Sequence, residues 1–168
     1  MSVEEPPESK VKVGDHAPDF ALPDQNNRMV SLKDLIGKIA VVLYFYPADF
    51  SRGCTAEACS FRDNYEVFRG AGAEVVGVSS QSVDSHRRFA AENNLPFILL
   101  SDKDGKVRKI YGVQSTFGLI PGRVTYVIDK KGIIRHIFSS QFNATKHVDE
   151  ALQVLKEISK ESNGVQKS

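Results

Sequence analysis

The sequence predicts an α/β protein, built as a three-layer sandwich around a mixed central sheet. Three observations lead to this fold class. In the middle of the chain, apolar runs of strand length alternate with segments of helical periodicity, which is typical of buried strands joined by helices. Near the end, two β-rich segments flank a short polar turn, which indicates a hairpin. Near the start, two shorter strand patterns predict an N-terminal β-hairpin.

The first elements lie before residue 73. Residues 17–22 and 28–32 are expected to form short strands around the polar turn 24–27. Residues 39–46 form an unbroken apolar run that stops at a proline, as in a strand buried on both faces. A helix is expected from about Gly53 to Arg69, because apolar residues repeat every three or four positions, at Ala58, Phe61, Tyr65 and Phe68.

Two further strands flank a second helix. Residues 73–79 are apolar enough for a buried strand. Ser82 or Asp84 is a suitable N-cap for a helix that ends near Asn93. Residues 95–100 then predict a short strand. The segment 103–106 is expected to form a turn.

The last elements are a hairpin and an amphipathic helix. Residues 124–129 and 133–138 predict paired strands around a Lys-Lys-Gly turn. Asn143 or Thr145 caps a helix whose apolar face carries Val148, Leu152, Leu155 and Ile158. The resulting order, β-β, β-α-β-α-β, β-β-α, predicts a thioredoxin-like arrangement for the central part of the chain.

Length and composition indicate one domain. The chain has 168 residues, and 41% of them are hydrophobic, which is enough for a single core. The polar, proline-bearing residues 1–11 and the polar residues 159–168 are expected to be flexible ends. The domain itself is predicted to span residues 12–158.

Charge and cysteine content exclude several classes of function. Lys and Arg number 22 against 21 Asp and Glu, so there is no electrostatic reason to expect a nucleic-acid or membrane partner. No stretch approaches the roughly 18 apolar residues of a membrane helix, and the acidic start lacks a secretory pattern. Two cysteines are too few for a disulfide scaffold and fit a reducing compartment. A cytoplasmic protein is therefore expected.

Cys54 is the first candidate for chemistry. It follows a buried strand, a proline and a short loop, so it lies where the next helix begins. A helix N-terminus offers unpaired N–H groups and about half a positive charge, and both favour a thiolate. A free cysteine with a pKa of about 8.5 is only about 3% thiolate at pH 7. The position of Cys54 therefore predicts a nucleophile.

Cys59 lies five residues further along the same predicted helix. The helical rise and turn separate two such Cα atoms by about 8.7 Å, whereas a disulfide needs less than about 7 Å. A bridge to Cys54 would therefore require at least the first turns of the helix to unwind. The alternative, that these are two helical cysteines that never meet, is equally compatible with the spacing.

The segment Pro47-x-x-x-Ser51-x-x-Cys54 resembles the active-site signature of peroxiredoxins, and a second cysteine five residues on resembles their Q-type, or bacterioferritin-comigratory-protein, subfamily. The similarity extends over most of the chain and is strongest to plant and cyanobacterial members. Other matching segments fall in order at 13–20, 45–49, 61–63, 100–102, 117–126 and 141–142.

This resemblance implies roles for five residues. By position, Cys54 corresponds to the peroxidatic cysteine and Cys59 to the resolving one. Ser51 would hydrogen-bond the thiolate and the peroxide, and Pro47 would shield the pocket from water. Arg123 corresponds to an arginine that pairs with the thiolate and polarises the peroxide. Such donors stabilise the charge that grows on the leaving oxygen as the O–O bond breaks.

The resemblance also implies a catalytic cycle and its partners. Cys54 attacks hydrogen peroxide or an alkyl hydroperoxide and becomes a sulfenic acid, which Cys59 converts to a disulfide. Thioredoxin or a similar dithiol then reduces the disulfide. No metal or organic cofactor is required, and a monomer is expected. A processed chloroplast protein is the alternative to the cytoplasmic location.

Several residues depart from the family pattern or are expected to be structural. Ser51 replaces the usual threonine, and Arg52 replaces a common proline. Glu57, one turn after Cys54, is expected to be a solvated helix residue, and the alternative is that it orients an arginine. The four histidines are scattered, so a metal site is not expected. Among the aromatic residues, Tyr46 alone is expected to reach the pocket.

Two other functions fit parts of the sequence. A general disulfide oxidoreductase uses a Cys-x-x-Cys pair, in which the thiols bridge without unwinding; four intervening residues do not suit that role. A non-enzymatic thioredoxin-like binder, such as a copper-delivery protein, would need a metal ligand near the cysteines, and no histidine is placed there.

Overall fold

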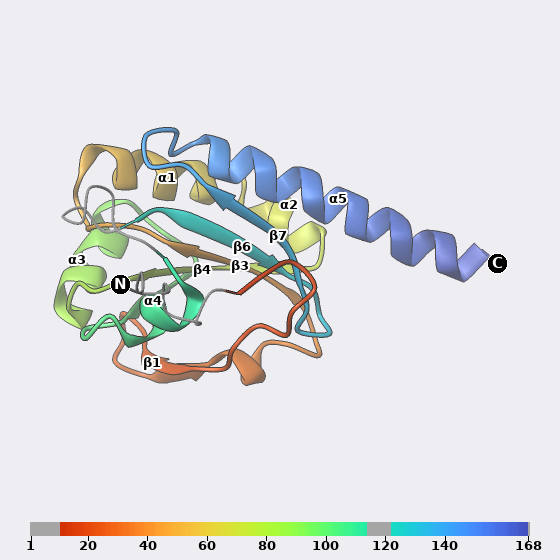
Figure 1. Ribbon diagram of the computed structural model, residues 1–168. Helices are drawn as coiled ribbons and strands as arrows, with labels where there is room; N and C mark the ends of the chain where they lie inside the picture. Colours follow the sequence, from red (N-terminus) through yellow and green to blue (C-terminus); the bar gives the residue numbers. More distant parts are fainter. Residues whose placement is uncertain (1–10, 114–121, 168) are drawn as a thin grey trace, which may run out of the picture.

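The computed structural model describes residues 11–113 and 122–167 (Figure 1). Its centre is a five-stranded sheet in the order β5-β4-β3-β6-β7. Strand β4 pairs in parallel with both β3 and β5. Strand β6 pairs antiparallel with both β3 and β7. The predicted mixed sheet is confirmed. The strands are β3 (Ala40–Phe45), β4 (Ala73–Ser79), β5 (Ile98–Ser101), β6 (Val124–Ile128) and β7 (Ile134–Ser139).

Helices and a hairpin cover the two faces of this sheet and make three layers (Figure 1). One face is covered by α1 (Arg52–Asp63), α2 (Tyr65–Gly70), α3 (Val83–Glu92) and α5 (Lys146–Lys167). The other face is covered by β1 (Ala21–Pro23), β2 (Met29–Ser31), the 3-10 helix η1 (Leu32–Asp34) and α4 (Lys106–Tyr111). The antiparallel pair β1 and β2 confirms the predicted N-terminal hairpin, with shorter strands.

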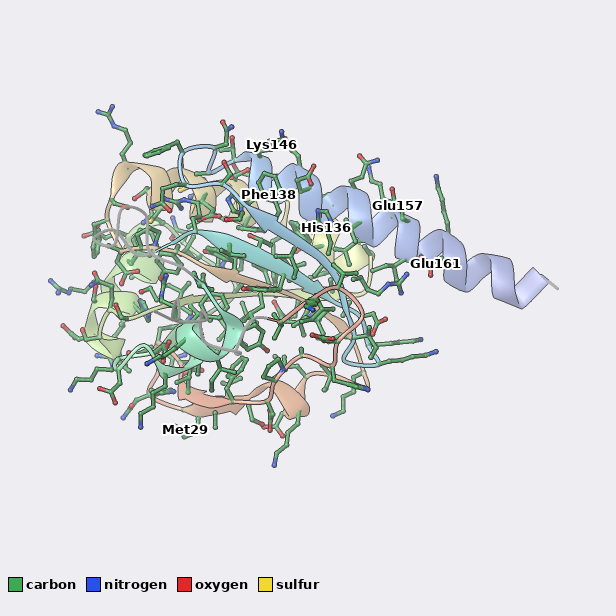
Figure 2. All side chains as sticks on the ribbon, in the orientation of Figure 1. Met29, His136, Phe138, Lys146, Glu157 and Glu161 are labelled. Carbon is green, nitrogen blue, oxygen red and sulfur yellow. The ribbon has the colours of Figure 1, made fainter. Side chains whose placement is uncertain are left out.

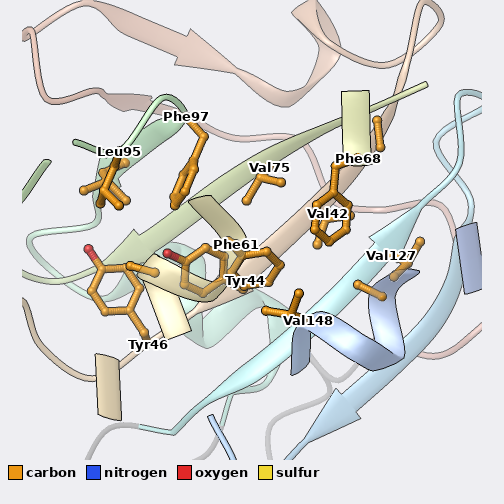
Figure 3. Close-up of a cluster of buried hydrophobic side chains, with 14 of the residues drawn as sticks. Val42, Tyr44, Tyr46, Phe61, Phe68, Val75, Leu95, Phe97, Val127 and Val148 are labelled. Carbon is orange, nitrogen blue, oxygen red and sulfur yellow. The ribbon is translucent and has the colours of Figure 1, made fainter. Parts of the chain in front are cut away.

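Alternation along β3 explains why its sequence is apolar throughout. Tyr44 faces the helices and its neighbours Leu43 and Phe45 face the hairpin, so every residue of the strand is buried. Figure 3 shows the cluster on the helical side. The rings of Tyr44 and Phe61 stack there with centroids 4.5 Å apart. Burying a phenylalanine such as Phe61 contributes roughly 1.5–3 kcal/mol, which anchors α1 to the sheet.

Two predicted segments differ from the structure. The helix expected from Gly53 to Arg69 is broken at Asn64, whose side-chain amide donates to the Ser60 carbonyl at 2.8 Å. Side chains of this type compete with the backbone for its hydrogen bonds and so interrupt helices. The turn expected at residues 103–106 leads directly into the short helix α4, which the sequence analysis missed.

The C-terminal helix α5 packs against β7 and then extends past the sheet (Figure 1). Polar contacts fasten it to the strand, and Figure 2 labels several of the residues involved. His136 Nε2 lies 2.9 Å from Glu150, and the Lys146 ammonium lies over the Phe138 ring. The backbone stays helical to Lys167, whereas residues 159–168 were expected to form a flexible tail. The flexibility of this end stays a prediction.

The similarity at residues 117–126 and the absence of a membrane helix can be compared with the structure only over the described residues. Residues 117–121 of the similarity at 117–126, including the proline before Gly122, lie outside the described residues. Within residues 11–113 and 122–167, no helix is long and apolar enough to cross a membrane.

Candidate active site

Cys54 lies in the first turn of α1, as predicted, and its side chain is 1% exposed. Ser51 is the N-cap of this helix: its hydroxyl oxygen accepts from the Cys54 N–H at 3.4 Å and donates to the Ala48 carbonyl at 3.1 Å. Ser51 therefore fixes the turn that carries the thiol. Its predicted bond to the thiolate and the peroxide stays a prediction.

Arg123 joins α1 to the loop after β7. The guanidinium is 5% exposed, and its Nη2 lies 3.4 Å from the Cys54 sulfur. Its Nη1 donates to Glu57 Oε1 at 2.5 Å and its Nε donates to the Gln141 carbonyl at 3.1 Å. Three partners around one planar fork fix the direction of the guanidinium. The structure thus brings the predicted arginine to the predicted nucleophile across 69 residues of sequence.

Gly53 leaves room for this arginine. A Cβ atom at this position would lie 3.0 Å from Arg123 Nη2. Such a contact is closer than ordinary van der Waals separation. A side chain at Gly53 would therefore displace the guanidinium that contacts the Cys54 sulfur.

Glu57 corrects an expectation: it is fully buried rather than solvated. It lies one turn after Cys54 on the face of α1 that packs against the sheet, and Arg123 supplies the counter-charge that its burial needs. Burial raises the pKa of Glu57 to about 8, and the nearby guanidinium acts in the opposite direction. Burial lowers the pKa of Arg123, but Glu57 and the Cys54 sulfur outweigh it, so the net shift is upward.

His147, from α5, lies behind Glu57. Its Nδ1 is 3.8 Å from Glu57 Oε2. Its Nε2 donates to the Ser140 carbonyl at 2.8 Å, and burial lowers its pKa to about 4. The ring is therefore neutral at pH 7, and its Nδ1 accepts from the Thr125 hydroxyl at 2.8 Å. His147 was not among the predicted site residues, because the four histidines are scattered along the sequence.

A buried cluster anchors the loop that precedes Cys54. Asp49 accepts hydrogen bonds from the Tyr46 hydroxyl at 2.6 Å and the Ser85 hydroxyl at 2.7 Å, and it lies 2.7 Å from His86 Nδ1. The other ring nitrogen of His86 donates to a carbonyl of β5 at 3.0 Å. Phe50 has a φ of 66°, which is uncommon for a residue other than glycine. The Asp49 contacts hold the loop in this conformation.

Tyr46 and Pro47 lie where β3 ends. Tyr46 is buried and directs its hydroxyl to Asp49, so it supports the loop from below. Pro47 is half-buried directly after it. The shielding role of Pro47 stays a prediction.

Arg108, from the unpredicted helix α4, joins the end of β3 to the segment before β6. Its guanidinium donates to the carbonyl of Tyr46 at 2.9 Å and to that of Gly122 at 2.9 Å. These carbonyls precede Pro47 and Arg123 directly. A sequence signal for this helix exists in Asp102, whose carboxylate accepts from the first N–H groups of α4.

Cys59 lies in different surroundings. It is partly exposed, and its sulfur donates to Asn93 Oδ1 at 3.6 Å. Both cysteines are free thiols, and α1 is continuous between them. This agrees with the expectation that an intact helix keeps the two sulfurs from bridging.

The described residues contain no cluster of three or more His, Cys, Asp or Glu side chains suited to a metal ion. A hollow of about 610 Å³ lies between the N-terminal hairpin and α4, and none of the five predicted site residues lines it. Around Cys54 the structure brings together one sulfur, one guanidinium, one carboxyl group and a helix N-terminus. Together these groups can stabilise a thiolate and polarise a small molecule that approaches it.

Comparisons with known proteins identify relatives of this chain. The model of the AhpC/TSA family matches residues 13–137. The chain is 52% identical over 151 residues to "Peroxiredoxin Q, chloroplastic" of Sedum lineare, which covers 89% of this chain and 81% of that protein. The solved structure of the peroxidoxin BcpB from Mycobacterium tuberculosis has a TM-score of 0.81 and 39% identity, covering 88% and 97% of the two chains.

A second solved structure bears on the substrate. It is that of the bacterioferritin comigratory protein of Xanthomonas campestris, described for the alkyl peroxide reduction activity of that protein. The TM-score is 0.77 and the identity 28%, with 83% of this chain and 92% of that chain covered.

Proposed function

Because the chain belongs to the AhpC/TSA family, with peroxiredoxin Q proteins among its relatives, it is a thiol-dependent peroxidase, and we propose that Cys54 attacks the peroxide and Cys59 resolves the product. The observation that carries this assignment is the single guanidinium of Arg123, which contacts both the Cys54 sulfur and the buried Glu57 carboxyl group. The buried positive charge beside a helix N-terminus suits a thiolate nucleophile.

In the first step the Cys54 thiolate attacks one oxygen of the hydroperoxide. A sulfur–oxygen bond forms, the O–O bond breaks, and its electron pair leaves on the second oxygen, which takes a proton to become water or an alcohol. Arg123 Nη2 donates to the sulfur before the reaction and to the departing oxygen during it. Ser51 and Pro47 are proposed to complete the pocket, by hydrogen bonding and by limiting the access of water.

In the second step the Cys59 thiolate attacks the sulfur of the Cys54 sulfenic acid. The S–S bond forms, the S–O bond breaks, and hydroxide leaves with the proton that Cys59 released, as water. The helical spacing requires α1 to unwind between the two cysteines for this step. Both thiols belong to one helix, so the disulfide needs no second chain, which supports a monomeric enzyme.

In the third step a dithiol, proposed to be thioredoxin, reduces the disulfide by exchange and releases both thiols. In the reduced fold Cys59 is the more exposed of the two thiols, and its sulfur is the proposed point of attack for the reductant. Hydrogen peroxide and alkyl hydroperoxides are the proposed substrates. The alkyl peroxide reduction activity of the Xanthomonas protein supports the second class.

The location and the domain limits are proposed as well. The chloroplastic name of the Sedum relative supports the chloroplast, and a cytoplasmic location stays a prediction. The catalytic domain is proposed to span residues 12–158, because Ile158 still packs against the core. Residues 1–11 and 159–168 are proposed as its flexible ends.

The assignment is tested by intact mass and a free-thiol count within seconds of adding one equivalent of hydrogen peroxide. The wild type should lose both thiols and two hydrogens. Cys54→Ser should show no turnover, and Cys59→Ser should react once and accumulate a sulfenic acid that dimedone traps. Survival of both thiols in the wild type, or full turnover in Cys54→Ser, would contradict the proposal.

A further inference from the structure

Asn93, the C-cap of α3, faces the turn of α1 that carries Cys59. Its side-chain amide donates to the Phe89 carbonyl at 3.0 Å, and a carbonyl can only accept. The amide orientation is therefore fixed, and Oδ1 is the atom that faces the Cys59 sulfur at 3.6 Å. Because Oδ1 is also an acceptor, this contact requires a hydrogen on the sulfur.

Arg62 makes a second contact with the same residue of α3. It lies three positions after Cys59, on the same side of α1. Its Nη1 donates to the backbone carbonyl of Asn93 at 2.8 Å, while its Nε donates to Asp63 at 3.0 Å. This hydrogen bond is charge-assisted and satisfies a carbonyl at the end of a helix, where carbonyls lack helical partners. Two neighbouring side chains of α1 are thus held by one residue of α3.

These contacts exist only while the Cys59 turn is helical and packed against α3. The disulfide requires the helix between Cys54 and Cys59 to open, and the Cys59 turn can move toward Cys54 only after it separates from Asn93. We propose that Asn93 and Arg62 form a latch that holds Cys59 away from Cys54 and sets the rate of disulfide formation. The inference rests on the proposed roles of the two cysteines, and both latch residues act by positioning rather than by touching the peroxide.

The strength of the latch decides between two fates of the sulfenic acid on Cys54. If the Cys59 turn opens, the thiolate attacks, the disulfide forms and water leaves. If it stays closed, a second hydroperoxide oxidises the sulfenic acid to a sulfinic acid and is itself reduced to water or an alcohol. A weaker latch should therefore speed resolution and protect Cys54 from over-oxidation.

The test separates the two steps in Asn93→Ala and Arg62→Ala. Each reduced protein is mixed with hydrogen peroxide, quenched after milliseconds to seconds, alkylated and weighed. The rate constant for oxidation of Cys54 should stay within about twofold of the wild type. Disulfide formation should be about fivefold faster in Asn93→Ala, which loses one neutral hydrogen bond, and about tenfold faster in Arg62→Ala, which loses a charge-assisted one. The sulfinic acid formed at high peroxide should fall by the same factors.

Arg87→Ala is the matched control, because Arg87 lies on α3 and forms an exposed ion pair with Asp84 of the same helix. It should change neither rate. Unchanged or slower disulfide formation in both latch variants would overturn the inference, since a purely structural contact would lower stability without speeding resolution. A wild type that keeps both thiols would instead refute the proposed function, so the two failures are distinguishable.

Discussion

The two cysteines of α1 lie five residues apart and in opposite surroundings. Cys54 is buried, its turn is capped by Ser51, and the guanidinium beside it is fixed by three partners. Cys59 is partly exposed, and a single long S–H···O contact reaches it from α3. Several contacts therefore fix Cys54 and its turn, whereas the Cys59 sulfur itself is held by a weaker hydrogen bond.

This difference matches the two kinds of chemistry proposed for them. A nucleophile that stabilises charge on a leaving oxygen gains from donors already in place, because no reorganisation is then needed during the reaction. A resolving thiol has to move, and every contact that holds it in the reduced state slows it. One helix can therefore combine a preorganised end with a releasable end when different elements hold each of them.

Among substitutions that keep both cysteines, loss of the positive charge beside Cys54 should lower the rate of the peroxide reaction the most. Arg123→Gln removes the charge that faces the sulfur, so the rate constant of Cys54 with hydrogen peroxide should fall by about 100- to 1000-fold. Rapid-quench mass spectrometry measures this rate. Alkylation of Cys59 by iodoacetamide should stay unchanged, because Arg123 does not contact it.

Arg135→Gln is the control for this substitution. Arg135 pairs with Asp129 and Glu161 at the opposite end of β7 from the site. The Arg135→Gln variant should be somewhat less stable than the wild type, and its Cys54 should react with hydrogen peroxide at the wild-type rate. A similar rate for Arg123→Gln and the wild type would mean that the guanidinium contributes little to the reaction.

An intermediate effect concerns pH and the buried groups behind Cys54. The pKa of His147 is lowered from 6.5 to about 4, so the folded state binds this proton less readily than the unfolded state. Its contribution to stability is complete above pH 6.5 and is lost as the pH falls toward 4. Between pH 7 and pH 5 the free energy of unfolding should fall by about 2 kcal/mol from this group alone.

The contribution is isolated by comparing the wild type with His147→Gln in urea at each pH. Glu57, Arg123 and Glu150 face the ring and remain in both proteins, so their effects largely cancel in the difference. The His147→Gln variant should show a flatter dependence on pH. Parallel curves for the two proteins would show that the neutral ring does not contribute in this way.

The smallest effect tests a departure from the family pattern. Arg52 is the first helical residue of α1, a position where proline is favoured, and the preceding Ser51 has φ −71° and ψ 153°, which suits a residue before proline. Arg52→Pro should therefore keep the peroxide rate within about twofold and raise the free energy of unfolding by about 0.4–1 kcal/mol. Kinetics and urea unfolding check both values. A large loss of rate would show that the Arg52 side chain takes part in the site.

Much of the fold followed from local patterns. The apolar run 39–46 predicted a buried strand because a strand with two covered faces has no polar side. The predicted helix start at Cys54 followed from a strand, a proline and a loop in succession. The break at Asn64 and the helix α4 were missed, because they depend on hydrogen bonds of one side chain each, Asn64 and Asp102, which leave no periodic signal.

Local spacing in the sequence predicts the fold class, the position of Cys54 at a helix start and the need to unwind α1 before the two thiols meet. The resemblance added Arg123. The packing of separate elements, in contrast, buries Glu57 against Arg123, lets Arg108 and Asp49 hold the loop, and brings Asn93 to Cys59. Those contacts join residues 34 to 66 positions apart, and a side chain's burial and charge partners are set by packing between elements, which sequence spacing does not encode.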